Sequence, residues 1–112
     1  MNNVPSDILA RAALDLRCIG IRELAWKYDL VLEVIYELNT YDYLILGGDV
    51  YRIDTNTGHI SSTGDNWYYS KNCHGSDVLE SVNKARDYIT NYHARNGEDF
   101  CYSVVYEKCK QV

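Results

Sequence analysis

The spacing of apolar residues predicts two helices in the first part of the chain. Apolar side chains recur three and four residues apart from Ile8 to Leu16, which predicts a helix that Gly20 would end. Helical spacing returns after Asp29, a residue type that caps helix N-termini well, and it continues as far as Thr40. Two N-terminal helices are therefore expected.

From Tyr41 onward the helical spacing gives way to the alternation that is typical of β-strands. The earlier segment 21–27 fits either a short strand or a turn. The pattern after Tyr41 predicts strands over 43–46 and 50–53 with Gly47-Gly48 between them as a turn or a bulge, a turn over 54–58, a returning strand over 59–62, and an extended piece over 67–69. These segments should form a meander.

The longest helix is predicted to begin with Ser76 as its N-cap and to end at 96–97. Its apolar positions define one buried stripe, made of Val78, Val82, Ala85, Ile89 and Tyr92. A last strand should pack on this helix through the alternating residues Phe100, Tyr102, Val104 and Tyr106. The expected fold is a single α+β domain over residues 1–112, with a mostly antiparallel sheet, two N-terminal helices and one long helix before the last strand.

The length and composition predict a cytoplasmic globular protein. The chain has 112 residues, enough for one compact domain with one core. No apolar run approaches the roughly 20 residues that span a bilayer, and the first residues lack the basic and apolar regions of a signal peptide. In a reducing compartment the four cysteines should be free thiols.

The charge is unevenly distributed along the chain. The net charge is −5, and residues 29–66 alone carry seven acidic side chains and one basic side chain, a net of −6. Nucleic acid is a poor partner for such a chain, because phosphate binding needs clustered Lys and Arg. A basic protein is the better match, since the acidic segment would steer it to the surface.

Part of this charge falls on one side of the second predicted helix. Asp29, Glu33 and Glu37 recur every four residues, so they share a helix face. Like charges at this spacing destabilise a helix by about 0.2–0.5 kcal/mol per pair. A stripe that costs local stability favours a role in binding, although an ordinary solvated helix face is the alternative.

The sequence offers little support for catalysis or for a cofactor. Cys73-His74 invites a nucleophile or metal site, but neither C-x-x-C nor H-x-x-x-H spacing accompanies it. The Gly47-Gly48 pair lacks the pattern of a phosphate-binding loop, and backbone geometry explains it better. We therefore expect a binding protein without enzyme activity, metal or cofactor. A protein-interaction adaptor and a Cys/His-dependent enzyme are the alternatives.

Two strings and their order relative to the helices resemble a known family. The stretch from Tyr43 to Tyr51 (YLILGGDVY) is followed by Asp65-Asn-Trp-Tyr68 and by a long helix that contains Ser81 and the sequence ARDYI. Over residues 22–106 the chain resembles bacterial polymorphic-toxin immunity proteins, in particular the immunity protein 40 family.

The resemblance implies an antitoxin that protects the cytoplasm of a bacterial cell. Such a protein binds the C-terminal toxin domain that a neighbouring cell delivers, as in contact-dependent growth inhibition, and blocks it stoichiometrically. The toxins are often basic nucleases, which would agree with the acidic segment. No nucleic acid or membrane partner is expected, and the oligomeric state stays open.

The expected toxin-binding residues are acidic and aromatic. Acidic side chains would meet Lys and Arg of the toxin, and aromatic side chains would anchor the interface. Trp67 alternatively belongs to the core. The full set is Glu33, Glu37, Asp49, Tyr51, Asp54, Asp65, Trp67 and Tyr68.

Overall fold

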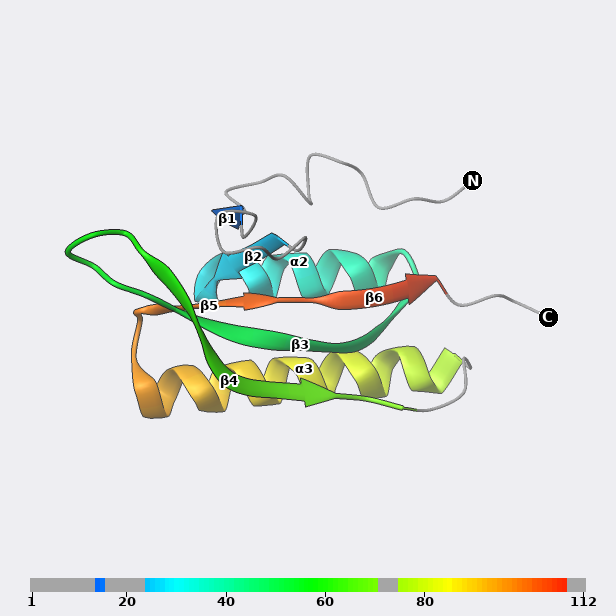
Figure 1. The fold of residues 1–112 in the computed structure, drawn as a ribbon. Coiled ribbons are helices and arrows are strands. Elements are labelled where there is room, and N and C mark those ends of the chain that lie inside the picture. The colour runs from blue at the N-terminus through cyan, green and yellow to red at the C-terminus, as the bar shows by residue number, and fades with distance from the viewer. Residues whose placement is uncertain (1–13, 16–23, 71–74, 109–112) are drawn as a thin grey trace.

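A computed structural model describes residues 14–15, 24–70 and 75–108 of the chain (Figure 1). In chain order the elements are β1 (Leu14–Asp15), β2 (Leu24–Lys27), α2 (Tyr28–Thr40), β3 (Tyr43–Ile53), β4 (Ile60–Tyr68), α3 (Gly75–Asn96), β5 (Phe100–Ser103) and β6 (Val105–Lys108). Neither of these helices has the length and apolarity that crossing a membrane requires.

The strands form one antiparallel sheet in the order β1-β2-β5-β3-β4, and β6 continues beyond β5 to pair with β3. Both helices pack against β3 and against each other, on one side of the sheet (Figure 1). The expected α+β fold, with an antiparallel sheet and a long helix before the last strands, is confirmed.

The main core lies between the two helices and the sheet. All five residues of the stripe predicted on α3 are buried. All of them except Val78 share the main core cluster with Tyr102 of β5 and with Val104, which lies between β5 and β6. Because alternate residues of a strand face opposite sides, Cys101, which precedes Tyr102, joins a second cluster with Ala25, Tyr51 and Ile60. Periodicity therefore identified the core-facing residues of this half of the chain correctly.

The prediction of two N-terminal helices is wrong at the first helix. Leu14 and Asp15 lie in β1 and pair with Ala25 and Leu24 of β2, so a helix cannot run through to Leu16. The remaining residues of that predicted helix, and Gly20, lie outside the described residues. Pairing with the edge of β2 gives these two backbone units hydrogen-bond partners, and this tertiary contact overrides the apolar spacing.

The second predicted helix is confirmed as α2, but its N-cap is not Asp29. The helix begins at Tyr28, and the N-cap position belongs to Lys27, whose side chain makes no capping hydrogen bond. Asp29 lies in the first turn, where the positive end of the helix dipole stabilises a carboxylate. The short-strand interpretation of segment 21–27 is correct for residues 24–27, which form β2.

β3 is one strand of 11 residues, and Gly47-Gly48 lies inside it. The pairing of β3 with β6 shifts register between Ile45 and Gly47, so the glycine pair marks a bulge in a continuous strand and does not close a hairpin. β4 is likewise continuous from Ile60 to Tyr68, which merges two extended segments that the pattern separated.

β3 extends past the end of β4, and α3 covers the edge that β4 leaves unpaired there. The backbone N–H of Ile45 donates a hydrogen bond of 3.0 Å to Oγ of Ser81, and this hydroxyl donates in turn to the carbonyl oxygen of Val78 at 2.8 Å. Ser81 is fully buried. One serine thus satisfies a strand N–H that would otherwise be buried without a partner.

We expect Ser81→Ala to lower the free energy of unfolding by about 1–3 kcal/mol, because it leaves the N–H of Ile45 buried and unpaired. Urea denaturation followed by circular dichroism would measure the loss. Asn83→Ala on the same helix is a control, since Asn83 is half-buried and contacts Arg86 only at the surface. Equal stability of the two variants would contradict this role of Ser81.

Candidate functional site

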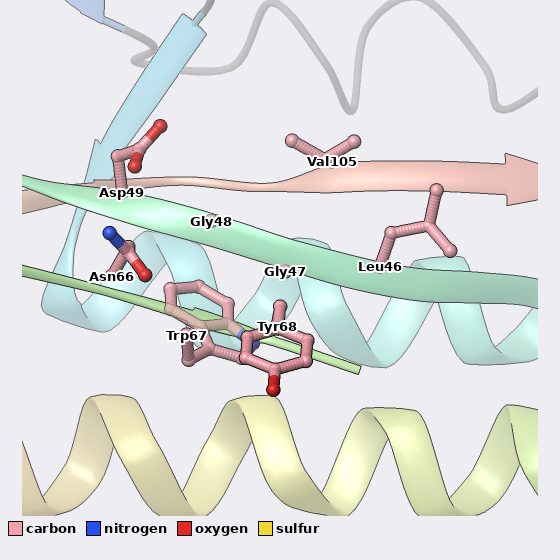
Figure 2. A pocket seen from close by; sticks show the side chains of 8 residues that line it. All are labelled: Leu46, Gly47, Gly48, Asp49, Asn66, Trp67, Tyr68 and Val105. Atoms are coloured by element: carbon pink, nitrogen blue, oxygen red, sulfur yellow. The ribbon is translucent and has the colours of Figure 1, made fainter. Parts of the chain in front are cut away.

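The two strings that carry the family resemblance lie side by side in the sheet. In the antiparallel register of β3 and β4, Gly47 is opposite Tyr68, Gly48 is opposite Trp67, and Asp49 is opposite Asn66. Figure 2 shows these residues together, with Asp49 pointing away from α3 and Trp67 lying between the two strands and that helix. Segments far apart in sequence therefore build one local structure.

Glycine is required at position 48 because two neighbours approach its backbone closely. A Cβ atom there would lie 2.0 Å from the carbonyl oxygen of Ser103 and 2.5 Å from the indole ring of Trp67. Non-bonded atoms cannot come so close. The ring of Trp67 therefore occupies the space that the absent side chain of Gly48 leaves, and it stacks on Tyr88 of α3 with centroids 5.1 Å apart.

A shallow, open depression of about 290 Å³ lies beside the glycine pair. We call it the sheet depression. Its walls carry one acidic side chain, one amide and one tyrosine, and the remaining lining is apolar or glycine. The lining residues are Leu46, Gly47, Gly48, Asp49, Asn66, Trp67, Tyr68 and Val105 (Figure 2).

Of the predicted toxin-binding residues, Asp49, Trp67 and Tyr68 meet at the sheet depression. Asp49 is half-buried, and its backbone N–H donates to Oγ of Ser103 at 2.9 Å. Tyr68 is 69% exposed, and the ammonium group of Lys84 lies 5.2 Å from its ring centroid. A cation of the protein itself thus already contacts this aromatic side chain.

The other two predicted aromatic anchors lie in the interior. Trp67 is 5% exposed and Tyr51 is 3% exposed. Trp67 belongs to the main core, and Tyr51 packs with Cys101, its partner in the register of β3 and β5. Neither ring offers the open surface that an anchor needs in the free protein. The position of Trp67 agrees with the alternative interpretation, in which this residue belongs to the core.

Asp54 and Asp65 are exposed, but both carboxylates make contacts within the fold. Oδ1 of Asp54 accepts hydrogen bonds from the backbone N–H groups of Asn56 and Thr57, at 2.9 and 3.3 Å, and so stabilises the β3–β4 turn. Asp65 accepts a hydrogen bond of 2.9 Å from the hydroxyl of Tyr92 on α3. Burial, followed by this hydrogen bond, raises the pKa of Tyr92 above its ordinary value.

Glu33 and Glu37 lie on α2, on the helix-covered side of the sheet, and the structure does not bring them together with Asp49. Glu33 is exposed and Glu37 is half-buried. With Asp29 they form what we call the acidic face of α2. Tyr36, which is 68% exposed, borders this face, and the sequence prediction missed it. The sequence feature that could have identified Tyr36 is an aromatic residue among the polar positions of a predicted helix.

Cys101 is the one cysteine in the described part of the chain. Cys73 and His74 lie outside it. Burial raises the pKa of the Cys101 thiol to about 12, so this thiol stays protonated and unreactive near neutral pH. Within the described ranges no three His, Cys, Asp or Glu side chains gather in a way that could hold a metal ion.

The sequence model of a protein family described as Immunity protein 40 matches residues 15–106. No curated protein and no solved structure matches the chain. The matched range contains β2, α2, β3, β4, α3 and β5 in full. Both the sheet depression and the acidic face of α2 therefore lie within it.

Proposed function

The chain belongs to the immunity protein 40 family, and on that premise we propose that it neutralises a basic toxin domain by binding it one to one. Membership of an immunity-protein family implies a cognate toxin as the partner. Three further points are our proposal: the toxin is basic, binding blocks its active surface stoichiometrically, and one particular face of this chain binds it. Neutralisation would then need no turnover.

The observation that carries this proposal is the acidic face of α2. Residues 29–66 have a net charge of −6 in a chain whose total is −5, and α2 contributes three of their seven acidic side chains. Glu33 is exposed, so a basic surface can approach it. A field of this sign raises the association rate of a basic partner and repels an acidic one.

The like-charge spacing on α2 has a local energetic cost. Glu33 and Glu37 are four residues apart, and this like-charge spacing costs about 0.2–0.5 kcal/mol. Glu37 also lies in the last turns of the helix, where the negative end of the dipole disfavours a carboxylate, and no basic residue occupies the last turn. Binding a cationic surface would turn this cost into a favourable interaction.

The proposal is tested with the double variant Glu33→Lys/Glu37→Lys. We expect it to weaken binding to the toxin domain that co-purifies with the tagged chain by about 10- to 100-fold, mainly through slower association. The affinity of the variant should also depend less on salt. Surface plasmon resonance at several salt concentrations measures both effects, and growth of toxin-exposed cells reports protection.

A matched control is Asp87→Lys/Glu98→Lys, which makes the same change in net charge at exposed positions on and after α3. It should cost much less affinity than the α2 variant. If the two variants weaken binding equally, only net charge matters and the proposed face is wrong. If Asp49→Lys weakens binding while the α2 variant does not, the toxin binds at the sheet depression. A co-purifying toxin domain that is acidic would contradict the proposed function itself.

A further inference from the structure

A groove lies between α2 and α3, next to the acidic face. It has a volume of about 260 Å³ and is more enclosed than the sheet depression. We call it the interhelical groove. Its lining combines apolar side chains with two amides and one cation, and it consists of Leu32, Ile35, Tyr36, Asn39, Leu79, Val82, Asn83 and Arg86.

Two large side chains at the rim of the groove are exposed to solvent. Tyr36 on α2 is 68% exposed, and Leu79 on α3 is 55% exposed. Leu79 lines the groove. It follows the buried Val78 in the chain and therefore lies beside the buried stripe of α3. Apolar surface of this kind, bordered by charged residues, is typical of protein-binding sites.

The lining of the groove carries one charged side chain, a cation on α3. On α2, Glu33 lies three residues before Tyr36, so the two side chains are neighbours on the helix surface. On α3, Arg86 lines the groove, and its guanidinium donates a hydrogen bond of 3.0 Å to Oδ1 of Asn83. No acidic side chain lines the groove itself.

We propose that the interhelical groove receives an apolar side chain of the toxin, with Lys or Arg residues of the toxin placed beside it over the acidic face of α2. This inference rests on the proposed function and specifies its partner. The apolar side chain removes Leu79 and the ring of Tyr36 from water. Arg86 in the groove repels Lys and Arg, and this favours their placement over the acidic face of α2.

The test uses the full-length chain and the toxin domain that co-purifies with it. Leu79→Gln and Tyr36→Gln keep good or adequate helix formers in place and remove apolar surface. We expect each to weaken toxin binding by about tenfold, through faster dissociation, with an unchanged salt dependence. Leu24→Gln, at a 39% exposed leucine on β2, is the matched control and should leave affinity within about twofold.

The outcomes separate this inference from the proposed function. If Glu33→Lys/Glu37→Lys weakens binding but both groove variants bind like the unchanged chain, the groove is not used and the proposed function stands. If the groove variants change only the association rate and its salt dependence, the apolar contact is refuted. If the chain alone sediments as a dimer that Leu79→Gln dissociates, a second copy fills the groove and the inference is overturned. If no toxin domain co-purifies, both proposals fail.

Discussion

Gly48→Ala should destabilise the fold by about 3 kcal/mol or more, although it adds a single methyl group. The added carbon would lie 2.0 Å from the carbonyl oxygen of Ser103, which is main chain and cannot rotate aside. It would also meet the ring of Trp67, which is held against Tyr88. Relief requires that β3 move away from both neighbouring strands. Urea denaturation monitored by tryptophan fluorescence and circular dichroism would measure the loss.

Gly58→Ala is the matched control for this prediction. Gly58 lies in the β3–β4 turn with φ +75°, and no atom within 4 Å would contact an added Cβ. Its substitution should therefore cost only the strain of a left-handed backbone, about 1–2 kcal/mol. If Gly48→Ala and Gly58→Ala unfold at the same urea concentration, the close approach at Gly48 does not limit stability.

Trp67→Ala should lower the free energy of unfolding by about 3–5 kcal/mol. The ring fills the space above Gly48, contacts α3 through Tyr88 and is 5% exposed, so its removal leaves a cavity between sheet and helix. Trp67→Phe should cost less, because an aromatic ring remains. The indole N–H also has no hydrogen-bond partner in the described structure, so its loss breaks no bond. Thermal and urea unfolding of both variants would rank them.

The same variants decide whether Trp67 acts as an interface anchor. A buried ring should affect binding only through the fraction of molecules that are folded. We therefore expect folded Trp67→Phe to bind the toxin domain with the affinity of the unchanged chain. A large loss of affinity in a fully folded Trp67→Phe protein would show that the ring contacts the toxin after all.

The parts of the fold that the sequence predicts best are those with a long, regular pattern. The stripe of α3 repeats over five buried positions, and Tyr102 and Val104 keep their alternation across the break between β5 and β6. Such repeats are readable because burial on one face is the dominant energetic term in both elements. β1 shows the limit, since two residues are too few to display a period and only the edge of β2 makes them a strand.

The candidate site was predictable in its chemistry but not in its geometry. The spacing of Glu33 and Glu37 already placed them on one helix face, because a helix fixes neighbours locally. Whether Asp49 lies near them depends on which side of the sheet α2 covers, and no local pattern contains that information. Similarly, the sequence predicts both Tyr51 and Tyr68 as anchors, yet Tyr51 packs with Cys101 and is buried whereas Tyr68 is exposed.

The position of β5 in the sheet has a consequence for how the chain folds during synthesis. β2 and β3 do not pair with each other; β5 lies between them and joins Ala25 to Ser103 and Val50 to Tyr102. A ribosome makes β5 after β2, α2, β3, β4 and α3, so the nascent chain can form its helices and the β3–β4 hairpin but cannot close the sheet. Such long-range pairing is slow to nucleate. The complete sheet should therefore form only once residues 100–103 have left the ribosome, and a nascent chain that reaches no further than α3 carries two unjoined halves of a sheet.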